Sequence, residues 1–151
     1  MMQHAMLQVS KNRNQNRQRK RHIEHTTSNF VRSRMSLLLP ISTSPGFSPR
    51  ESIADPERLI SGTPAFKTWP LDTSREGNVR TGIWEATPGT TKSIKGEAFE
   101  FCHILEGLVR ITENDGESYL FRAGDSFVMK PGFIGSWETI ETVKKIYVFM
   151  E

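Results

Sequence analysis

The stretch "EFCHILEGLVRIT" (residues 100–112) lies at the centre of the most strand-like part of the chain. Its apolar residues are mostly β-branched or aromatic, which favours strands. Turn residues separate it from similar stretches, and the Asp-Gly pair in "ENDGE" (113–117) supplies the positive φ angles that a tight hairpin needs. The predicted strands are 65–69, 79–87, 98–105, 108–112, 118–122, 125–130, 135–140 and 143–150. With no amphipathic helix between them, they predict an antiparallel sandwich or barrel.

Charge divides the chain into two parts. Residues 1–50 carry nine Lys and Arg against one acid, a net charge of +8, whereas residues 51–151 carry 11 basic and 16 acidic residues, a net charge of −5. Residues 1–34 include "KNRNQNRQRKRH" (11–22), which is polar, positively charged and nearly free of apolar side chains, so this segment buries too little surface to offset the entropy of ordering. Residues 36–56, rich in Ser, Pro and Thr, resemble a linker. We predict a flexible basic arm and linker over 1–50, and a single folded domain over 51–151.

The basic arm allows three interpretations. Clustered Lys and Arg neutralise phosphates, as in a nucleic-acid or nuclear-targeting arm. An Arg-rich, acid-poor start with Ser is also loosely typical of an organelle transit peptide. The third interpretation is a solvated tail, or translated upstream sequence with Met35 as the true start. We favour the third and expect no nucleic-acid partner.

The single cysteine, Cys102, excludes an internal disulfide and fits a reducing compartment. No apolar run approaches the ~18 residues that a membrane span requires. Residues 35–41 follow basic residues as a secretory signal would, but Pro40 ends the run after three leucines. We therefore expect a cytoplasmic protein with no membrane partner.

Two motifs in residues 51–151 resemble those of the cupins, which are small double-sheet β-barrels. The first cupin motif ends with Glu, six residues and Gly, and Glu100 and Gly107 have this spacing. The second motif begins with Gly and continues to Pro-x-Gly, which matches Gly124 and Gly132 with Lys130 at the proline position. The resemblance implies an all-β, cupin-type jelly-roll barrel (a double-stranded β-helix, RmlC-like) that follows a disordered N-terminal arm.

The stretches "GIWEATPG" (82–89), "EFCHILEGLVRIT" and "AGDSFVMKPGFIGSWETIETVKKIYV" (123–148) are most similar to the cupin subfamily named for (S)-ureidoglycine aminohydrolase. Cupin metal sites use two His and a Glu from the first motif and a His from the second. Here the first two positions hold Ile94 and Gly96, or Ser93 and Lys95 at the alternative spacing, and the last holds Gly135. Residues 51–151 contain a single histidine, His103, whereas borderline divalent metals favour several imidazole or thiolate donors. We therefore predict no metal and no cofactor, with a non-standard divalent metal site as the alternative.

Strand alternation predicts which side chains meet inside the barrel. Glu100, Cys102 and Ile104 share one face of a strand, and His103 lies on the opposite face as a packing residue. Lys145 and Tyr147 likewise share a face of the last strand, and the subfamily resemblance includes a Lys and a Tyr at these positions. A buried carboxylate needs a partner. Our hypothesis is that Lys145 supplies the positive charge that a metal supplies in other cupins.

The predicted site therefore contains Glu100, Lys145 and Tyr147 as catalytic candidates, and Trp84, Cys102 and Trp137 as ligand-binding candidates. Lys145 facing solvent on an edge strand, and tryptophans serving only as core, are the alternative interpretation.

Two functions follow. The first is a small cupin that binds a small polar metabolite in its barrel, with or without an uncharacterised enzymatic activity. The alternative is a metal-dependent aminohydrolase or isomerase that acts on a ureidoglycine-like or sugar-like compound. Cupin subunits commonly pair through outer sheet faces, so the apolar Phe101 and Leu105 face suggests a homodimer.

Overall fold

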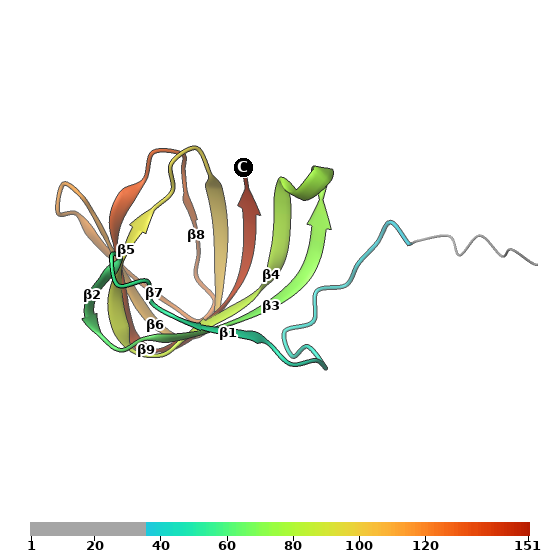
Figure 1. The fold of residues 1–151 in the computed structure, drawn as a ribbon, viewed down its shortest axis with the longest axis horizontal. Helices are drawn as coiled ribbons and strands as arrows, with labels where there is room; N and C mark the ends of the chain where they lie inside the picture. Colours follow the sequence, from blue (N-terminus) through green and yellow to red (C-terminus); the bar gives the residue numbers. More distant parts are fainter. Residues whose placement is uncertain (1–35) are drawn as a thin grey trace, which may run out of the picture. The chain divides into compact units, whose positions relative to one another are not determined.

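Two long antiparallel strands organise the fold, which is a curled β-barrel (Figure 1). The computed structural model describes residues 36–151, and residues 38–151 form one unit. β6 and β9 pair along almost their whole length, from Phe99 opposite Met150 to Glu113 opposite Gly135. The elements are β1 (Arg50–Ile53), β2 (Leu59–Gly62), β3 (Ala65–Ser74), the 3-10 helix η1 (Arg75–Gly77), β4 (Val79–Ala86), β5 (Gly89–Ile94), β6 (Phe99–Glu113), β7 (Ser118–Arg122), β8 (Ser126–Met129) and β9 (Ile134–Met150).

The remaining strands extend the sheet from these two. The second half of β9 pairs with β4, and the sheet continues through β3 to β1. The first half of β9 pairs with β5, which in turn pairs with β2, while β7 and β8 both pair with β6. The sheet therefore curls around an interior that β3, β4, β5, β6 and β9 all face. No helix in residues 36–151 has the length and apolarity of a membrane span.

A bulge at Gly107 lets both halves of β6 face this interior. Before it, even-numbered residues such as Cys102 and Ile104 are buried, and after it the odd-numbered Val109 and Ile111 are buried. Gly107 has a φ of 84°, and a side chain there would collide with the Thr142 carbonyl. One extra residue in a strand reverses its alternation, so the bulge keeps the apolar set on one side.

The all-β barrel and the hairpin at residues 113–117 are confirmed, but some predicted boundaries are wrong. The stretches 98–105 and 108–112 form one strand, as do 135–140 and 143–150, because the chain bends at these points without turning back. β1, β2 and β5 were not predicted. β1 lies in the predicted linker, where it pairs with β3, and the nearby Phe47 carbonyl accepts a hydrogen bond from the Trp69 indole at 3.1 Å.

Predictions about residues 1–35 lie outside the described residues, including the basic arm and its three interpretations. The division of the chain at residue 50, the cytoplasmic location and the homodimer stay predictions. Phe101 and Leu105 on the outer face are partly buried within the single chain.

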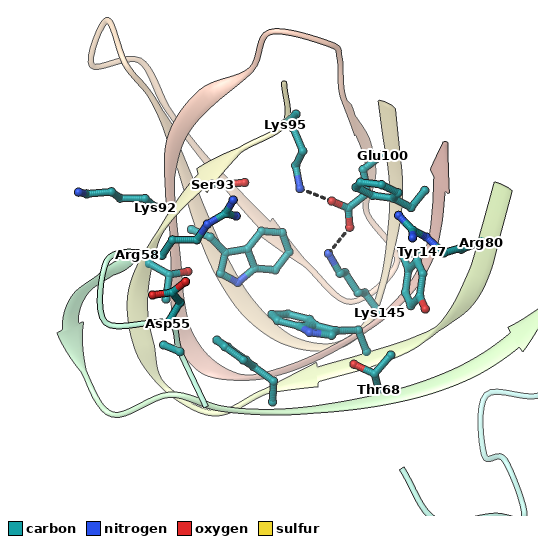
Figure 2. Close-up of a pocket in the computed structure, with 16 residues that line it drawn as sticks. Asp55, Arg58, Thr68, Arg80, Lys92, Ser93, Lys95, Glu100, Lys145 and Tyr147 are labelled. Atoms are coloured by element: carbon teal, nitrogen blue, oxygen red, sulfur yellow. Dashed lines mark hydrogen bonds and ion pairs between the residues drawn. The ribbon is translucent and has the colours of Figure 1, made fainter. Parts of the chain in front are cut away.

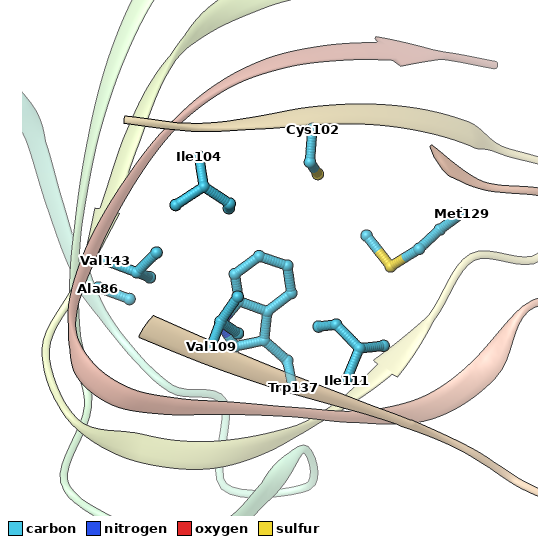
Figure 3. Close-up of a cluster of buried hydrophobic side chains, with 8 residues drawn as sticks. All are labelled: Ala86, Cys102, Ile104, Val109, Ile111, Met129, Trp137 and Val143. Carbon is cyan, nitrogen blue, oxygen red and sulfur yellow. The ribbon is translucent and has the colours of Figure 1, made fainter. Parts of the chain in front are cut away.

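The hydrophobic core fills one side of the interior (Figure 3). Trp137 lies among Cys102, Ile104 and Met129, with aliphatic residues around them. Phe66, Trp84, Phe121, Phe127 and Phe133 pack against this cluster from its edges. The core occupies only part of the barrel, and a cavity lies beside it.

Candidate ligand-binding site

A cavity of about 370 Å³ opens into the barrel beside the core (Figure 2). Trp137 takes part in both the core and the cavity wall. The cavity wall combines aromatic rings with an unusual number of charged side chains. Its lining residues are Ala54, Asp55, Arg58, Phe66, Thr68, Arg80, Trp84, Thr91, Lys92, Ser93, Lys95, Glu100, Trp137, Lys145, Tyr147 and Phe149.

Glu100 is held between two lysines, and we name Lys95, Glu100 and Lys145 the charge cluster. Lys145 Nζ donates to Glu100 Oε1 at 2.7 Å, and Lys95 Nζ donates to Glu100 Oε2 (Figure 2). Glu100 is 7% exposed and Lys145 is 5% exposed. The Lys95 side chain is 13% exposed. The hypothesis that Glu100 and Lys145 meet inside the barrel therefore matches their observed positions.

Strand register explains how residues distant in sequence meet here. Glu100 on β6 and Lys145 on β9 both point inward, and β6 pairs directly with the second half of β9. Lys95 comes from the turn between β5 and β6. Its backbone N–H donates to the Phe133 carbonyl and its carbonyl accepts from Ala98, both at 3.0 Å, so the turn is anchored where the side chain enters the cavity.

Glu100 and Lys145 hold each other in their ionised forms. Burial raises the pKa of the Glu100 carboxyl, but the charges and hydrogen bonds of Lys145 and Lys95 outweigh burial and lower this pKa from 4.5 to about 2. Burial lowers the pKa of the Lys145 ammonium, whereas Cys102 and Glu100 raise it, and the net direction is above its usual 10.5. At neutral pH Glu100 is therefore an anion beside the Lys145 cation, and with Lys95 the charge cluster has a formal charge of +1.

An aromatic wall completes the inner end of the cavity. Trp84 stacks on Phe66 with ring centroids 5.3 Å apart and meets Trp137 edge-on at 5.4 Å. Lys145 Nζ lies 4.7 Å from the Trp84 ring centroid and 4.3 Å from that of Trp137. Both tryptophans thus hold the buried ammonium by cation–π contact and also line the cavity.

Cys102 lies behind the charge cluster, and it is not part of the cavity lining. Its Sγ accepts a hydrogen bond from Lys145 Nζ at 3.4 Å and donates to Glu100 Oε1 at 3.5 Å. Burial is the main reason that the pKa of the Cys102 thiol is raised to about 11. A buried, protonated thiol packs and donates here, and it does not reach a ligand in the cavity.

Tyr147 lines the cavity with its ring, but its hydroxyl points away from Glu100 (Figure 2). The hydroxyl lies against Gly82, where even a Cβ atom would come within 2.8 Å of it. Burial is the largest cause of the raised pKa of this phenol. The residue is therefore part of the wall, and no hydrogen bond joins its hydroxyl to the charge cluster.

Comparisons with known proteins agree with this architecture. Residues 73–147 match the model of the EutQ-like cupin domain. The chain contains a cupin domain. The match covers β4 to β9 almost completely, including Glu100 and Lys145.

Solved structures give the same fold. The chain is similar to a protein of unknown function from Pseudomonas syringae pv. tomato, with 24% identity and a TM-score of 0.65 over 73% of this chain and 46% of that one. It is also similar to the EutQ protein of Clostridium difficile (18% identity, TM-score 0.51, 58% of this chain and 63% of that one) and to ectoine synthase from P. lautus (17% identity, TM-score 0.52, 65% and 72%). The chain thus spans less than two thirds of the first two proteins, and these identities show the fold alone. The comparison with curated proteins found no match.

The cupin metal site has no equivalent donor set in residues 36–151. No group of three His, Cys, Asp or Glu side chains in that range is arranged to hold a metal ion. His103 lies on the outer face, with its Nδ1 2.8 Å from Ser126 Oγ. Both oxygens of Glu100 are engaged by ammonium groups. These residues do not fit a cupin metal.

Sequence reasoning missed Lys95 as a member of the site. Lys95 occupies one of the two alternative positions of a cupin histidine, so the motif itself contained the relevant information. Arg58, Arg80 and Lys92 at the mouth of the cavity were also missed, because their strands and turns were not predicted to converge.

Proposed function

We propose that this cupin domain binds a small polar metabolite in the cavity beside the charge cluster. The observation that carries the proposal is the buried Glu100–Lys145 pair, 2.7 Å apart, at the wall of an open cavity. Removing two charges from water costs several kcal/mol, and a buried ion pair often stabilises a fold less than apolar residues would. The free-energy cost of burying this pair is thus better explained by ligand recognition than by a contribution to the stability of the fold.

The shape and composition of the cavity support this proposal. Its volume of about 370 Å³ is near the lower end of the range of roughly 300–1,000 Å³ that is typical of ligand sites. An aromatic wall formed by Trp84, Trp137 and Phe66 lines the cavity together with the charged side chains, and the Lys145 ammonium lies directly against both tryptophan rings. Apolar walls with a few polar groups are the usual construction of a small-molecule site.

The pKa directions favour binding over acid–base catalysis by this pair. A general acid or base works best when its pKa is near the working pH. The pKa of Glu100 is lowered to about 2 and that of Lys145 is raised. Neither group therefore exchanges a proton readily at neutral pH, although both orient polar groups of a ligand.

A thermal-shift screen of wild-type protein against ureides, organic acids and sugars tests the proposal. Affinity for any hit is then measured by calorimetry on Glu100→Gln and Lys145→Met, below the unfolding midpoint of each variant. We expect both substitutions to abolish binding, because they remove the polar centre of the cavity. Lys130→Met is the control, since Lys130 is exposed and does not line the cavity. Unchanged affinity in both site variants would show that the ligand does not use this site.

A metal-dependent aminohydrolase or isomerase is the second candidate, and it rests on the resemblance to the (S)-ureidoglycine aminohydrolase subfamily. Metal analysis of purified protein separates the two candidates. Stoichiometric Mn, Zn or Ni, lost together with activity on chelation, would support the metalloenzyme. Metal-independent ligand binding would support the first proposal.

A further inference from the structure

We infer that Lys95 anchors the acid group of a small organic monoanion, with the rest of the ligand against the aromatic wall. This inference rests on the proposed binding function and adds the chemical class of the ligand. Three features carry it: the charge balance of the cavity, the hydrogen-bonding capacity of each lysine, and the position of Lys95 at the cavity surface.

The first feature is an excess of positive charge. The charge cluster contains two lysines and one carboxylate, so one positive charge is left without a protein counter-charge. Five cationic side chains line the cavity as a whole against two acidic ones. The second acid, Asp55, is exposed and accepts a hydrogen bond from the Glu57 backbone at 2.9 Å. Anionic ligands are therefore favoured over neutral or cationic ones.

The second feature assigns the unused capacity to Lys95. An ammonium group has three donors. Lys145 uses two of them on Glu100 and Cys102, and its Nζ also faces both tryptophan rings. Lys95 Nζ makes one hydrogen bond, to Glu100, and it lies 6.0 Å from the centroid of the Phe149 ring. The Lys95 ammonium thus has N–H donors available for a ligand, whereas most of the hydrogen-bonding capacity of the Lys145 ammonium is used within the protein.

The third feature is partial access. The Lys95 side chain is 13% exposed, compared with 6% for that of Lys145. Lys95 Nζ extends into the cavity above Glu100 (Figure 2). A charge in such a place is poorly hydrated, so a ligand acid group gains a charge-assisted hydrogen bond and supplies the missing negative charge.

The mouth of the cavity strengthens this preference. Arg58, Arg80 and Lys92 are exposed and surround the opening. Arg80 is paired with Glu151 at 3.2 Å, whereas no ion pair holds Arg58 or Lys92 within the described residues. Positive charge at an opening attracts anions toward the site, and this attraction weakens as salt is added.

Matched compounds test the inference directly. Wild-type protein is titrated by calorimetry with benzoate, benzamide and benzylamine, and with butyrate, butyramide and butylamine, in a low-chloride buffer. Phenyl phosphate and benzenesulfonate distinguish a carboxylate site from a general anion site. We expect at least one acid to bind about tenfold more tightly than its amide, because a hydrogen bond to a charged group is stronger than a neutral one. The amines should bind most weakly.

Variants at Lys95 then test whether this lysine binds the acid group of the ligand. Lys95→Met leaves Glu100 and Lys145 as a neutral pair, so the protein should stay folded and lose the preference for acid over amide. Lys95→Arg should restore the preference, and Lys130→Met should leave it unchanged. If Lys145 is the true anchor, Lys95→Met will keep the preference, and this result overturns the inference.

The inference and the proposed function fail in different ways. Equal affinity for acid and amide, or no binding of any compound in both series, overturns the inference. If a neutral ureide or sugar still binds in the broader screen, the proposed binding function stands without the anionic ligand class. If no compound of any class binds, both fail.

Discussion

Glu100→Gln should strongly destabilise the protein at neutral pH and remove part of its acid sensitivity. The substitution keeps the size of the side chain but removes the charge that the buried Lys145 ammonium and the partly buried Lys95 ammonium share. Breaking a buried ion pair by removing one partner costs about 3–5 kcal/mol. Because the variant leaves Lys95 and Lys145 with no counter-charge between them, we expect a loss in this range at pH 7.

The lowered pKa of Glu100 determines how much of this loss in stability depends on pH. The pKa falls from 4.5 to about 2 on folding, and this difference corresponds to about 3 kcal/mol of stability. Because the folded pKa is the lower one, this stability is fully present above pH 4.5 and is lost as the pH falls toward 2. Linkage predicts a loss of about 2 kcal/mol by about pH 3.

Urea unfolding followed by tryptophan fluorescence between about pH 7 and pH 3 measures both quantities. The difference in unfolding free energy between wild type and Glu100→Gln should shrink by about 2 kcal/mol over this range. Glu138→Gln is the matched control. Arg110 and Glu138 are also 2.7 Å apart, but their side chains are 42% and 37% exposed, so this variant should cost only about 0–1 kcal/mol.

Two results would refute this reasoning. If Glu100→Gln costs no more than Glu138→Gln at pH 7, the Glu100 carboxylate is not held as the structure shows. If the difference from wild type is the same at pH 7 and pH 3, the Glu100 pKa is not lowered by its two lysines. Either result would also weaken the argument for an anionic ligand, which depends on an ionised cluster.

Three further predictions concern other parts of the fold. Cys102 should resist thiol reagents at about pH 8 in native protein and react on unfolding, since its pKa is about 11 and its side chain is fully buried. The labelling rate is measured with a chromogenic disulfide reagent, and rapid labelling of native protein would contradict the buried position of Cys102. Trp137→Ala should cost about 3–5 kcal/mol in urea unfolding, because it opens a void between core and cavity; a loss under about 1 kcal/mol would be inconsistent with its burial. Gly107→Ala should lower the melting temperature far more than Gly116→Ala. Both glycines have positive φ, but only at Gly107 would an added Cβ atom collide with neighbouring backbone atoms. Equal decreases in melting temperature would argue against the bulge.

Much of the fold could be predicted from local features of the sequence. The period-two alternation around Glu100 placed its side chain, that of Cys102 and that of Ile104 on one face, as observed. The same rule placed Lys145 and Tyr147 on one face of the last strand, and the structure shows that Lys145 is buried. Turn residues at 113–117 marked the hairpin between β6 and β7. These features are local because strand geometry and turn chemistry depend on neighbours in the chain.

The bulge at Gly107 could not be predicted in this way. A glycine after a glutamate is equally compatible with a turn that reverses the chain and with a bulge that only bends it. Pairing with β9 on the far side decides between them, and this pairing joins residues more than thirty positions apart. The short strands β1 and β2 are similar cases, since their partners β3 and β5 supply the hydrogen bonds that make them strands.

By itself, the sequence predicted an all-β barrel with cupin-type motifs, and it placed Glu100 and Cys102 on one strand face and Lys145 and Tyr147 on one face of the last strand. These depend on strand alternation and residue spacing, which are properties of short segments. Only the tertiary structure decided that Lys95 joins them, that Cys102 lies behind the cavity, and that the Tyr147 hydroxyl points elsewhere. The charge balance of a cavity depends on every charged side chain that the fold places around it. Lys95 lies in a turn whose orientation is set by packing against the rest of the barrel, so its place in the cavity depends on the tertiary structure.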